Sequence, residues 1–117
     1  PEDEEQKRLT FAQAATGASG IETLLSLSLE LYHNGSLKLE TIIKALTSNP
    51  AKILRINKGN LSVGNDADFC IVDINKPWMV KQENLISKSK NTSIENKKLQ
   101  GKVTNTFVKG EELFKLN

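Results

Sequence analysis

At 117 residues the chain holds enough for one domain, and its 38% apolar and 26% charged residues exclude a chain that is disordered throughout. The formal net charge is only +2. Residues 75–117 carry nine lysines against four glutamates, but these lysines are scattered among Asn and Ser with few aromatic residues. We therefore expect a solvated face and no nucleic-acid partner. The single cysteine, Cys70, excludes an internal disulfide and suits a reducing, cytoplasmic compartment, and no apolar run approaches the ~20 residues that cross a bilayer, so no membrane partner is expected.

The chain starts with a polar segment that leads into a stretch of small residues. Residues 1–8, PEDEEQKR, predict a short exposed helix with acids in its first turn, or else a mobile end. Residues 11–20 are rich in Ala, Thr, Ser and Gly, so the backbone at Gly17 and Gly20 can adopt positive φ or lie close to a ligand. Such a segment is more often a plain helix start than a ligand site, although N–H groups at a helix start suit an anionic or carbonyl-rich ligand.

A first long helix is predicted over residues 19–33, because apolar residues recur there at helical spacing. Ser19 or Gly20 is expected to cap it, with Glu22 favourably placed in the first turn. Asn34-Gly35 should end it, with Gly35 in the left-handed conformation.

Two shorter helices are predicted next. Ser36 is expected to cap a helix of about three turns whose apolar stripe consists of Leu39, Ile42, Ile43 and Leu46. Asn49 and Pro50 then predict a new N-cap and first helical position, and this helix should turn three apolar residues inward before Lys58-Gly59 stops it: Ile53, Leu54 and Ile56.

After Gly59 the apolar period changes from helical to strand-like. Residues 69–72 read as a buried strand, residues 75–77 as a turn and residues 78–80 as another short strand. Residues 82–98 predict a long polar loop with Ile86 and Ile94 as isolated anchors. A strand over residues 99–109, a turn at Gly110 and a terminal strand over residues 113–116 complete the pattern.

Residues 1–25 resemble the segment of dihydroorotases that follows an Asp-His-x-Pro turn and runs into "KRLPF…A…G…GLET". The matching residues are Lys7, Arg8, Leu9, Phe11, Gly17, Gly20, Ile21, Glu22 and Thr23, with Thr10 in place of a common Pro. Later stretches are similar to the same family: SNPAKILRI and DADFCIVD, then Trp78, SKSKNT and GKVTNTFVKG. The resemblance covers the whole chain as the C-terminal third of the enzyme, with Pro1 as the proline of that turn.

This resemblance implies an α+β fragment. Residues 1–57 would form the final helices and a loop of a TIM-like (β/α)8 metal-dependent hydrolase barrel, and residues 58–117 the C-terminal strands of an accessory composite β-sandwich. The order of the predicted elements, helices first and strands second, by itself favours an α+β fold or pieces of two domains. The absence of an initiator Met also predicts a piece of a longer protein.

The family's reaction is the reversible, zinc-dependent cyclisation of N-carbamoyl-L-aspartate to L-dihydroorotate in pyrimidine biosynthesis. Such a zinc site needs about three protein ligands, and the chain has one histidine, His33, so we expect no metal ligand and no catalytic residue in it. By the resemblance, the catalytic Asp precedes Pro1, and Glu2 stands where the family often has a substrate-contacting His. One role does map: backbone atoms of Thr16 and Gly17 would bind substrate.

The remaining polar residues are expected to be structural. Asp66 and Asp68 flank a strand start and suit turn or cap roles, and Ser26 has no partner base. Lys88 and Lys90 could touch an anion but suit a solvated loop, and Cys70 is expected to behave as a small buried hydrophobe.

Partners implied by the resemblance are the remaining N-terminal part of the same enzyme and the small-molecule substrate; a homodimer or an association with aspartate transcarbamoylase stays open. Without zinc ligands the fragment alone is expected to be inactive. Three alternatives stand beside this hypothesis: a related cyclic amidohydrolase such as an allantoinase or hydantoinase, a non-catalytic dihydroorotase-like structural partner, and a stand-alone Lys-rich interaction module.

Overall fold

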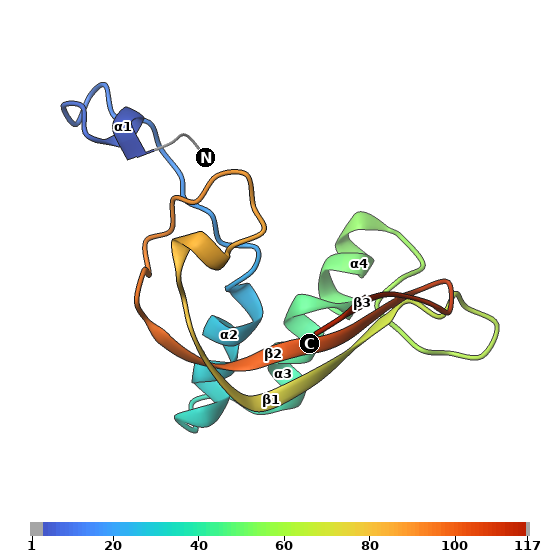
Figure 1. Ribbon diagram of the computed structural model, residues 1–117. Coiled ribbons are helices and arrows are strands. Elements are labelled where there is room, and N and C mark those ends of the chain that lie inside the picture. The colour runs from blue at the N-terminus through green and yellow to red at the C-terminus, as the bar shows by residue number, and fades with distance from the viewer. Residues whose placement is uncertain (1–3, 117) are drawn as a thin grey trace.

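The computed structural model describes residues 4–116, with side chains from residue 5 onward, and it is an α+β arrangement in which helices precede strands (Figure 1). Pro1 and Glu2, on which part of the family comparison depends, lie outside the described residues. The elements in chain order are α1 (Glu4–Lys7), α2 (Leu24–His33), α3 (Leu39–Leu46), α4 (Ser48–Leu54), β1 (Phe69–Met79), the 3-10 helix η1 (Gln82–Asn84), β2 (Lys98–Val108) and β3 (Glu111–Lys115). Within this part of the chain, no helix is long and apolar enough to span a membrane.

The three strands form one antiparallel sheet in the order β1-β2-β3. Strand β2 is therefore central, while β1 and β3 each have one edge without a partner strand in the described chain. The predicted strand over residues 99–109 is confirmed as β2, and the terminal strand is confirmed as β3 after the turn at Gly110, whose φ is +82°.

A small core forms where α2 crosses β2. Leu29 of α2 is fully buried there, and Leu99 of β2 is 3% exposed. Gly101 has φ +99°, and a Cβ at this position would lie 2.3 Å from Leu29 Cδ1, so only glycine lets the helix come this close to the strand. Ser26 Oγ donates to the Gly101 carbonyl at 2.6 Å and accepts a hydrogen bond from Trp78 Nε1 at 3.1 Å, which ties β1 to the same point.

Strand β1 differs from the sequence prediction. Asn75 to Pro77 were expected to form a turn, but they lie within the single strand Phe69–Met79, at a register shift between Asp73 and Pro77. An edge strand tolerates a proline at such an irregularity, because a residue there does not have to donate a backbone N–H to a second neighbouring strand.

The expected burial of residues 69–72 is also wrong: Cys70 is exposed, Phe69 is 37% exposed and Ile71 is 49% exposed. Phe69 stacks on Phe107 of β2 at 4.6 Å between ring centroids, a contact between neighbouring strands that leaves Phe69 itself 37% exposed. Cys70 is therefore not the buried hydrophobe that the apolar run predicts.

The helix boundaries also differ in part. Helix α2 starts at Leu24 and not at Ser19, and α3 has Lys38, not Ser36, at its N-cap. Gly35 has φ +78° just after Asn34, the C-cap of α2, as predicted. The helix predicted from the apolar stripe is confirmed as α3 with Ile42 buried, but Ile43 of that stripe is 40% exposed.

Helix α4 has Thr47, not Asn49, at its N-cap, and it ends at the left-handed Arg55. The inward orientation expected for three apolar residues around its C-terminus is wrong, since they are 81%, 68% and 51% exposed: Ile53, Leu54 and Ile56. Ala51 is the residue of α4 that is buried.

Candidate functional site

Thr16 and Gly17 lie in an irregular segment, residues 15–20, between α1 and α2, and both are exposed. Gly17 has φ +85°, and a Cβ built there would meet nothing within 4 Å, so the backbone is open on that side. Lys7 Nζ donates to the carbonyl of Ala15 at 2.9 Å and also to the carbonyl of Gly17, and it thereby brackets Thr16. Thr16 itself makes no hydrogen bond with any described residue, which leaves its backbone groups open to a ligand.

The end of this segment is attached to the loop that follows η1. The Ser19 N–H donates to the carbonyl of Asn91 at 2.7 Å, and Ser19 Oγ donates to the carbonyl of Ser89 at 2.9 Å and lies 3.2 Å from Ser87 Oγ. In Figure 1 the orange loop after η1 runs beside the blue chain that leads into α2. Ser19 was predicted to cap α2, and this is wrong because its hydroxyl group is used between loops.

Glu22 makes the second attachment. Its Oε2 accepts the Ile86 N–H at 3.0 Å and its Oε1 accepts the Ser87 N–H at 2.9 Å, so one half-buried carboxylate bridges two consecutive backbone amides. The predicted place of Glu22 in the first turn of the helix is wrong, because α2 begins two residues later. Hydrogen bonds to an ionised acceptor are about twice as strong as neutral ones, which makes this the firmer of the two attachments.

An open pocket of about 690 Å³ lies at this junction, lined by residues 18–23 and 85–87. Its rim carries Ile21, which is 91% exposed, and Ile86, which is 83% exposed, while Thr23 and Leu85 are buried beneath it. Ile86 was expected to anchor the long loop, but Leu85 and Thr92 are the buried residues there.

The described residues do not supply a metal centre. No three or more His, Cys, Asp or Glu side chains among residues 4–116 are grouped so that they could hold a metal ion. His33 Nε2 lies 3.0 Å from the Ile74 carbonyl and Ser26 Oγ is bonded to the Gly101 carbonyl, so both side chains tie α2 to the sheet. The residues present therefore do not fit the zinc site that the family resemblance implies.

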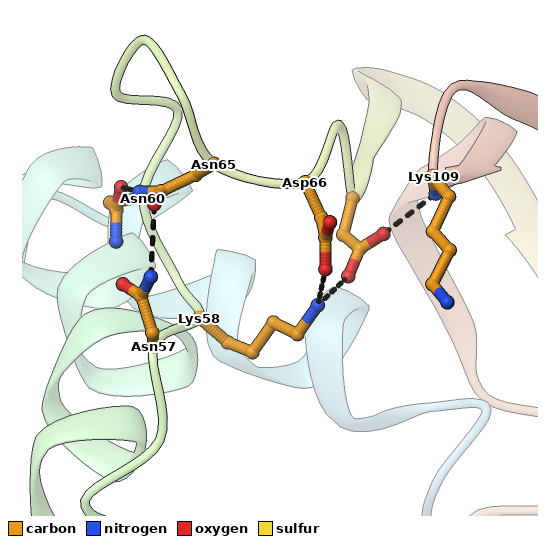
Figure 2. A network of polar contacts seen from close by, with 7 residues as sticks. Asn57, Lys58, Asn60, Asn65, Asp66 and Lys109 are labelled. Atoms are coloured by element: carbon orange, nitrogen blue, oxygen red, sulfur yellow. Dashed lines mark hydrogen bonds and ion pairs between the residues drawn. The ribbon is translucent and has the colours of Figure 1, made fainter.

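Asp66 and Asp68 belong to a network that joins the end of the helical part to the sheet (Figure 2). Lys58 Nζ donates to Asp66 Oδ2 at 2.7 Å and to Asp68 Oδ2 at 2.5 Å, and the Lys109 N–H in the β2–β3 turn donates to Asp68 Oδ1 at 2.8 Å. Beside it, Asn57 donates to Asn65, which donates to Asn60.

These contacts move two pKa values. The hydrogen bond from Lys58, followed by the one from the Lys109 backbone, lowers the pKa of Asp68 below its ordinary value. The hydrogen bonds to Asp66 and then Asp68 raise the pKa of Lys58. Each charge thus stabilises the other, and the two aspartates tie Lys58 and the β2–β3 turn together.

Sequence reasoning placed the exposed loop at Thr16 and Gly17 but missed Lys7, Ser19 and Glu22 as the residues that hold it. A signal was present: Glu22 falls in the GIET stretch and Ser87 is the first residue of SKSKNT, and both stretches resemble the same family. Nothing in the spacing of either stretch indicates that the two meet.

The chain is similar in sequence to a known family of proteins. The model of the amidohydrolase family matches residues 9–113. The chain is 40% identical over 114 residues to the dihydroorotase of Wolbachia sp. subsp. Drosophila simulans, covering 97% of this chain and 26% of that protein, and 43% identical over 108 residues to the dihydroorotase of Syntrophus aciditrophicus, covering 92% and 25%. The chain thus spans about a quarter of the length of the curated relatives it matches.

Solved structures share the fold. The L-hydantoinase (dihydropyrimidinase) of Arthrobacter aurescens matches with a TM-score of 0.83 and 31% identity over 89% of this chain and 24% of that one. The dihydropyrimidinase of Brevibacillus agri matches with a TM-score of 0.90 over 98% of this chain and 26% of that one; at 21% identity this second likeness concerns the fold alone.

Proposed function

This chain belongs to the amidohydrolase family, and from that premise we propose that it is the C-terminal part of a dihydroorotase. Its parent would interconvert N-carbamoyl-L-aspartate and L-dihydroorotate in the cytoplasm, as a step of pyrimidine biosynthesis. The observation that carries the proposal is the identity of about 40% with curated dihydroorotases over nearly the whole chain.

In the fold proposed for the parent, the two halves of this chain belong to two different domains. Residues 1–57 would complete a (β/α)8 barrel and residues 58–117 would belong to an accessory β-sandwich. The unpaired edges of β1 and β3 support the second assignment, since strands from elsewhere in the parent could pair there.

Substrate binding is proposed for the backbone of Thr16 and Gly17. The loop is exposed, Gly17 carries no side chain, and Thr16 makes no hydrogen bond among the described residues, so amide and carbonyl groups are accessible to a cyclic amide. Backbone recognition of this kind favours small residues, because larger side chains would block the approach.

Zinc is the metal proposed for the parent, with its ligands outside this chain. When bound, zinc would supply an activated water and polarise the amide carbonyl. The described residues would position substrate only, and the remaining part of the same enzyme would be the obligatory partner; a homodimer or aspartate transcarbamoylase are further proposed partners.

The test uses the full-length protein that contains this chain. We expect it to hydrolyse L-dihydroorotate and to form it from N-carbamoyl-L-aspartate, with zinc in the purified protein, and we expect the 117-residue chain alone to do neither. Turnover by the isolated chain would contradict the proposal, since its described residues offer no metal-binding group.

A hydantoinase is the second candidate, favoured by the 31% identity with the Arthrobacter enzyme. Assays with hydantoin and dihydrouracil beside dihydroorotate separate the two: preferred turnover of either would replace the first proposal with the second. No turnover of any cyclic amide by zinc-loaded protein would favour a non-catalytic structural partner.

A further inference from the structure

The segment that carries Thr16 and Gly17 has no regular structure of its own. Residues 15–20 lie in neither helix nor strand, so no ladder of backbone hydrogen bonds fixes their position. Gly17 lies two residues before Ser19, a reach of about 7 Å at most, and five residues before Glu22. Apart from the bond that Lys7 Nζ makes to its carbonyl, the Gly17 backbone is therefore expected to take its position from Ser19 and Glu22.

What fixes this segment at its C-terminal end comes from the other half of the chain. Four backbone groups and one side chain of residues 86–91 meet two side chains and one amide of residues 19–22, at 2.7–3.2 Å. The partners of Glu22 lie 64 and 65 residues further along the chain. Leu85, buried next to them, holds the start of that loop in place.

We propose that Glu22 is a positioning residue, whose carboxylate holds the substrate-contacting backbone of Thr16 and Gly17 in register through the Ile86 and Ser87 amides. This inference rests on the proposed function, because it takes Thr16 and Gly17 as the substrate contacts. In this role Glu22 contacts neither substrate nor metal, and it acts through the backbone that it holds. It makes substrate affinity depend on the loop after η1, in the half of the chain that holds the sheet.

The role proposed for Glu22 requires two acceptor oxygens on one side chain. A carboxylate offers two acceptor oxygens, whereas the nearly isosteric glutamine offers one oxygen and an NH2 group that cannot accept from an N–H. Glu22→Gln therefore keeps the shape and loses one of the two bonds, and it places a donor against a donor.

The experiment compares Glu22→Gln with Glu30→Gln in the full-length protein. Glu30 is a matched control, because it is half-buried and accepts a hydrogen bond from Lys97, at the end of this same loop, at 2.8 Å, but makes no hydrogen bond to residues 15–22. KM for L-dihydroorotate is expected to rise about 10- to 100-fold in Glu22→Gln, with kcat and zinc content within twofold of the unsubstituted protein, because displaced backbone contacts would weaken binding of the ground state and the transition state alike. In Glu30→Gln, KM should stay within twofold.

Hydrogen–deuterium exchange gives a readout that needs no turnover. Peptides covering residues 85–91 and 11–20 are expected to exchange at least about tenfold faster in Glu22→Gln, while peptides from β2 stay unchanged, because the lost bond is local. Faster exchange with an unchanged KM would overturn the positioning role. Unchanged exchange would overturn the attachment itself.

Two further outcomes are decisive. If kcat, zinc content and KM all deteriorate together in Glu22→Gln, the residue is merely structural and the proposal is wrong. If the unsubstituted protein turns over no dihydroorotate, the proposed function fails; KM is then measured with hydantoin or dihydrouracil, and exchange at residues 11–20 still decides whether Glu22 holds the loop.

Discussion

Ser26 is a buried polar residue at the contact between α2 and the sheet. It is 3% exposed, and its hydroxyl group donates to the Gly101 carbonyl while accepting the Trp78 indole N–H. Trp78 Nε1 also donates to the Gly101 carbonyl at 3.1 Å, so the indole N–H and this carbonyl stay paired with each other in Ser26→Ala. We expect a loss of about 1–2 kcal/mol in the free energy of unfolding, measured by urea titration of the full-length protein.

Ser28→Ala is the matched control. Ser28 Oγ bonds only the Leu24 carbonyl one turn back in α2, so its removal leaves no tertiary group unpaired. Alanine also has the higher helix propensity, and the change should be neutral or slightly stabilising, within about 0.5 kcal/mol. Equal losses in both variants would show that the bond to Gly101 does not matter.

Sequence reasoning at the residue scale worked where one residue determines the local backbone. Gly35 after α2 has the predicted positive φ, and the chain turns at Gly110 between β2 and β3 as predicted. It failed where the partner of a side chain is remote: Ser19 and Glu22 were assigned to the start of a helix, and they bond to a loop more than 60 residues away. The substrate-binding role of Thr16 and Gly17 stays a prediction.

At the scale of elements, the Lys58–Asp66–Asp68 network gives stability a pH dependence. The pKa of Asp68 is lowered on folding, so its contribution is complete above the ordinary value of 3.8 and is lost as the pH falls through the lower folded value. The pKa of Lys58 is raised, so its contribution is complete below the ordinary value of 10.5 and is lost as the pH rises through the higher folded value. The network should therefore hold across the neutral range.

Asp68→Asn tests this. We expect the variant to melt at a lower temperature than the unsubstituted protein at about pH 7, and the gap to close as the pH falls well below 3.8. The effect should be small, because these groups are exposed and screened by solvent. Asp73→Asn, an exposed carboxylate that accepts an N–H within its own strand, is the control and should show no such gap. A gap that persists in acid would contradict the ionic origin.

The elements that sequence reasoning predicted correctly are those with a strong local pattern: α3 with its apolar stripe, and the β2–β3 hairpin around Gly110. Strand β1 was divided in two because Asn75, Lys76 and Pro77 are turn-forming residues. They stay in a strand here because β1 lies at the sheet edge and is irregular between Asp73 and Pro77. That position depends on strand order, which local propensity does not reveal.

At the scale of the whole molecule, exposed apolar surface is the dominant feature. Among the described residues six hydrophobic side chains are buried, whereas twenty large ones are exposed, Phe11 and Val63 fully so. Exposed apolar side chains in this number lead us to expect that further protein surface covers some of them. The periodicity of the sequence predicts which apolar side chains share one face of a helix, but not whether this chain or another protein surface covers that face. For that reason Ile53 and Leu54 were expected to face inward.

The isolated 117-residue chain is therefore expected to self-associate and to bind hydrophobic dyes, whereas co-expression with the rest of the parent should yield a compact, dye-free complex. Size-exclusion chromatography with light scattering, together with dye fluorescence, measures this. A monomer with a sharp two-state melt would argue instead for a self-sufficient module.

The attachment of Glu22 to Ile86 and Ser87 also has a consequence in time. A ribosome makes residues 16–22 first and reaches Ser87 only after 65 more residues, which takes roughly 3–13 s at ordinary rates of synthesis. Throughout that interval Lys7 can hold the Ala15 and Gly17 carbonyls, but Ser19 and Glu22 have none of their partners from the loop after η1. A nascent chain that stalls or is cut before Ser87 would carry every residue of the proposed substrate loop and still lack the groups that fix its C-terminal end.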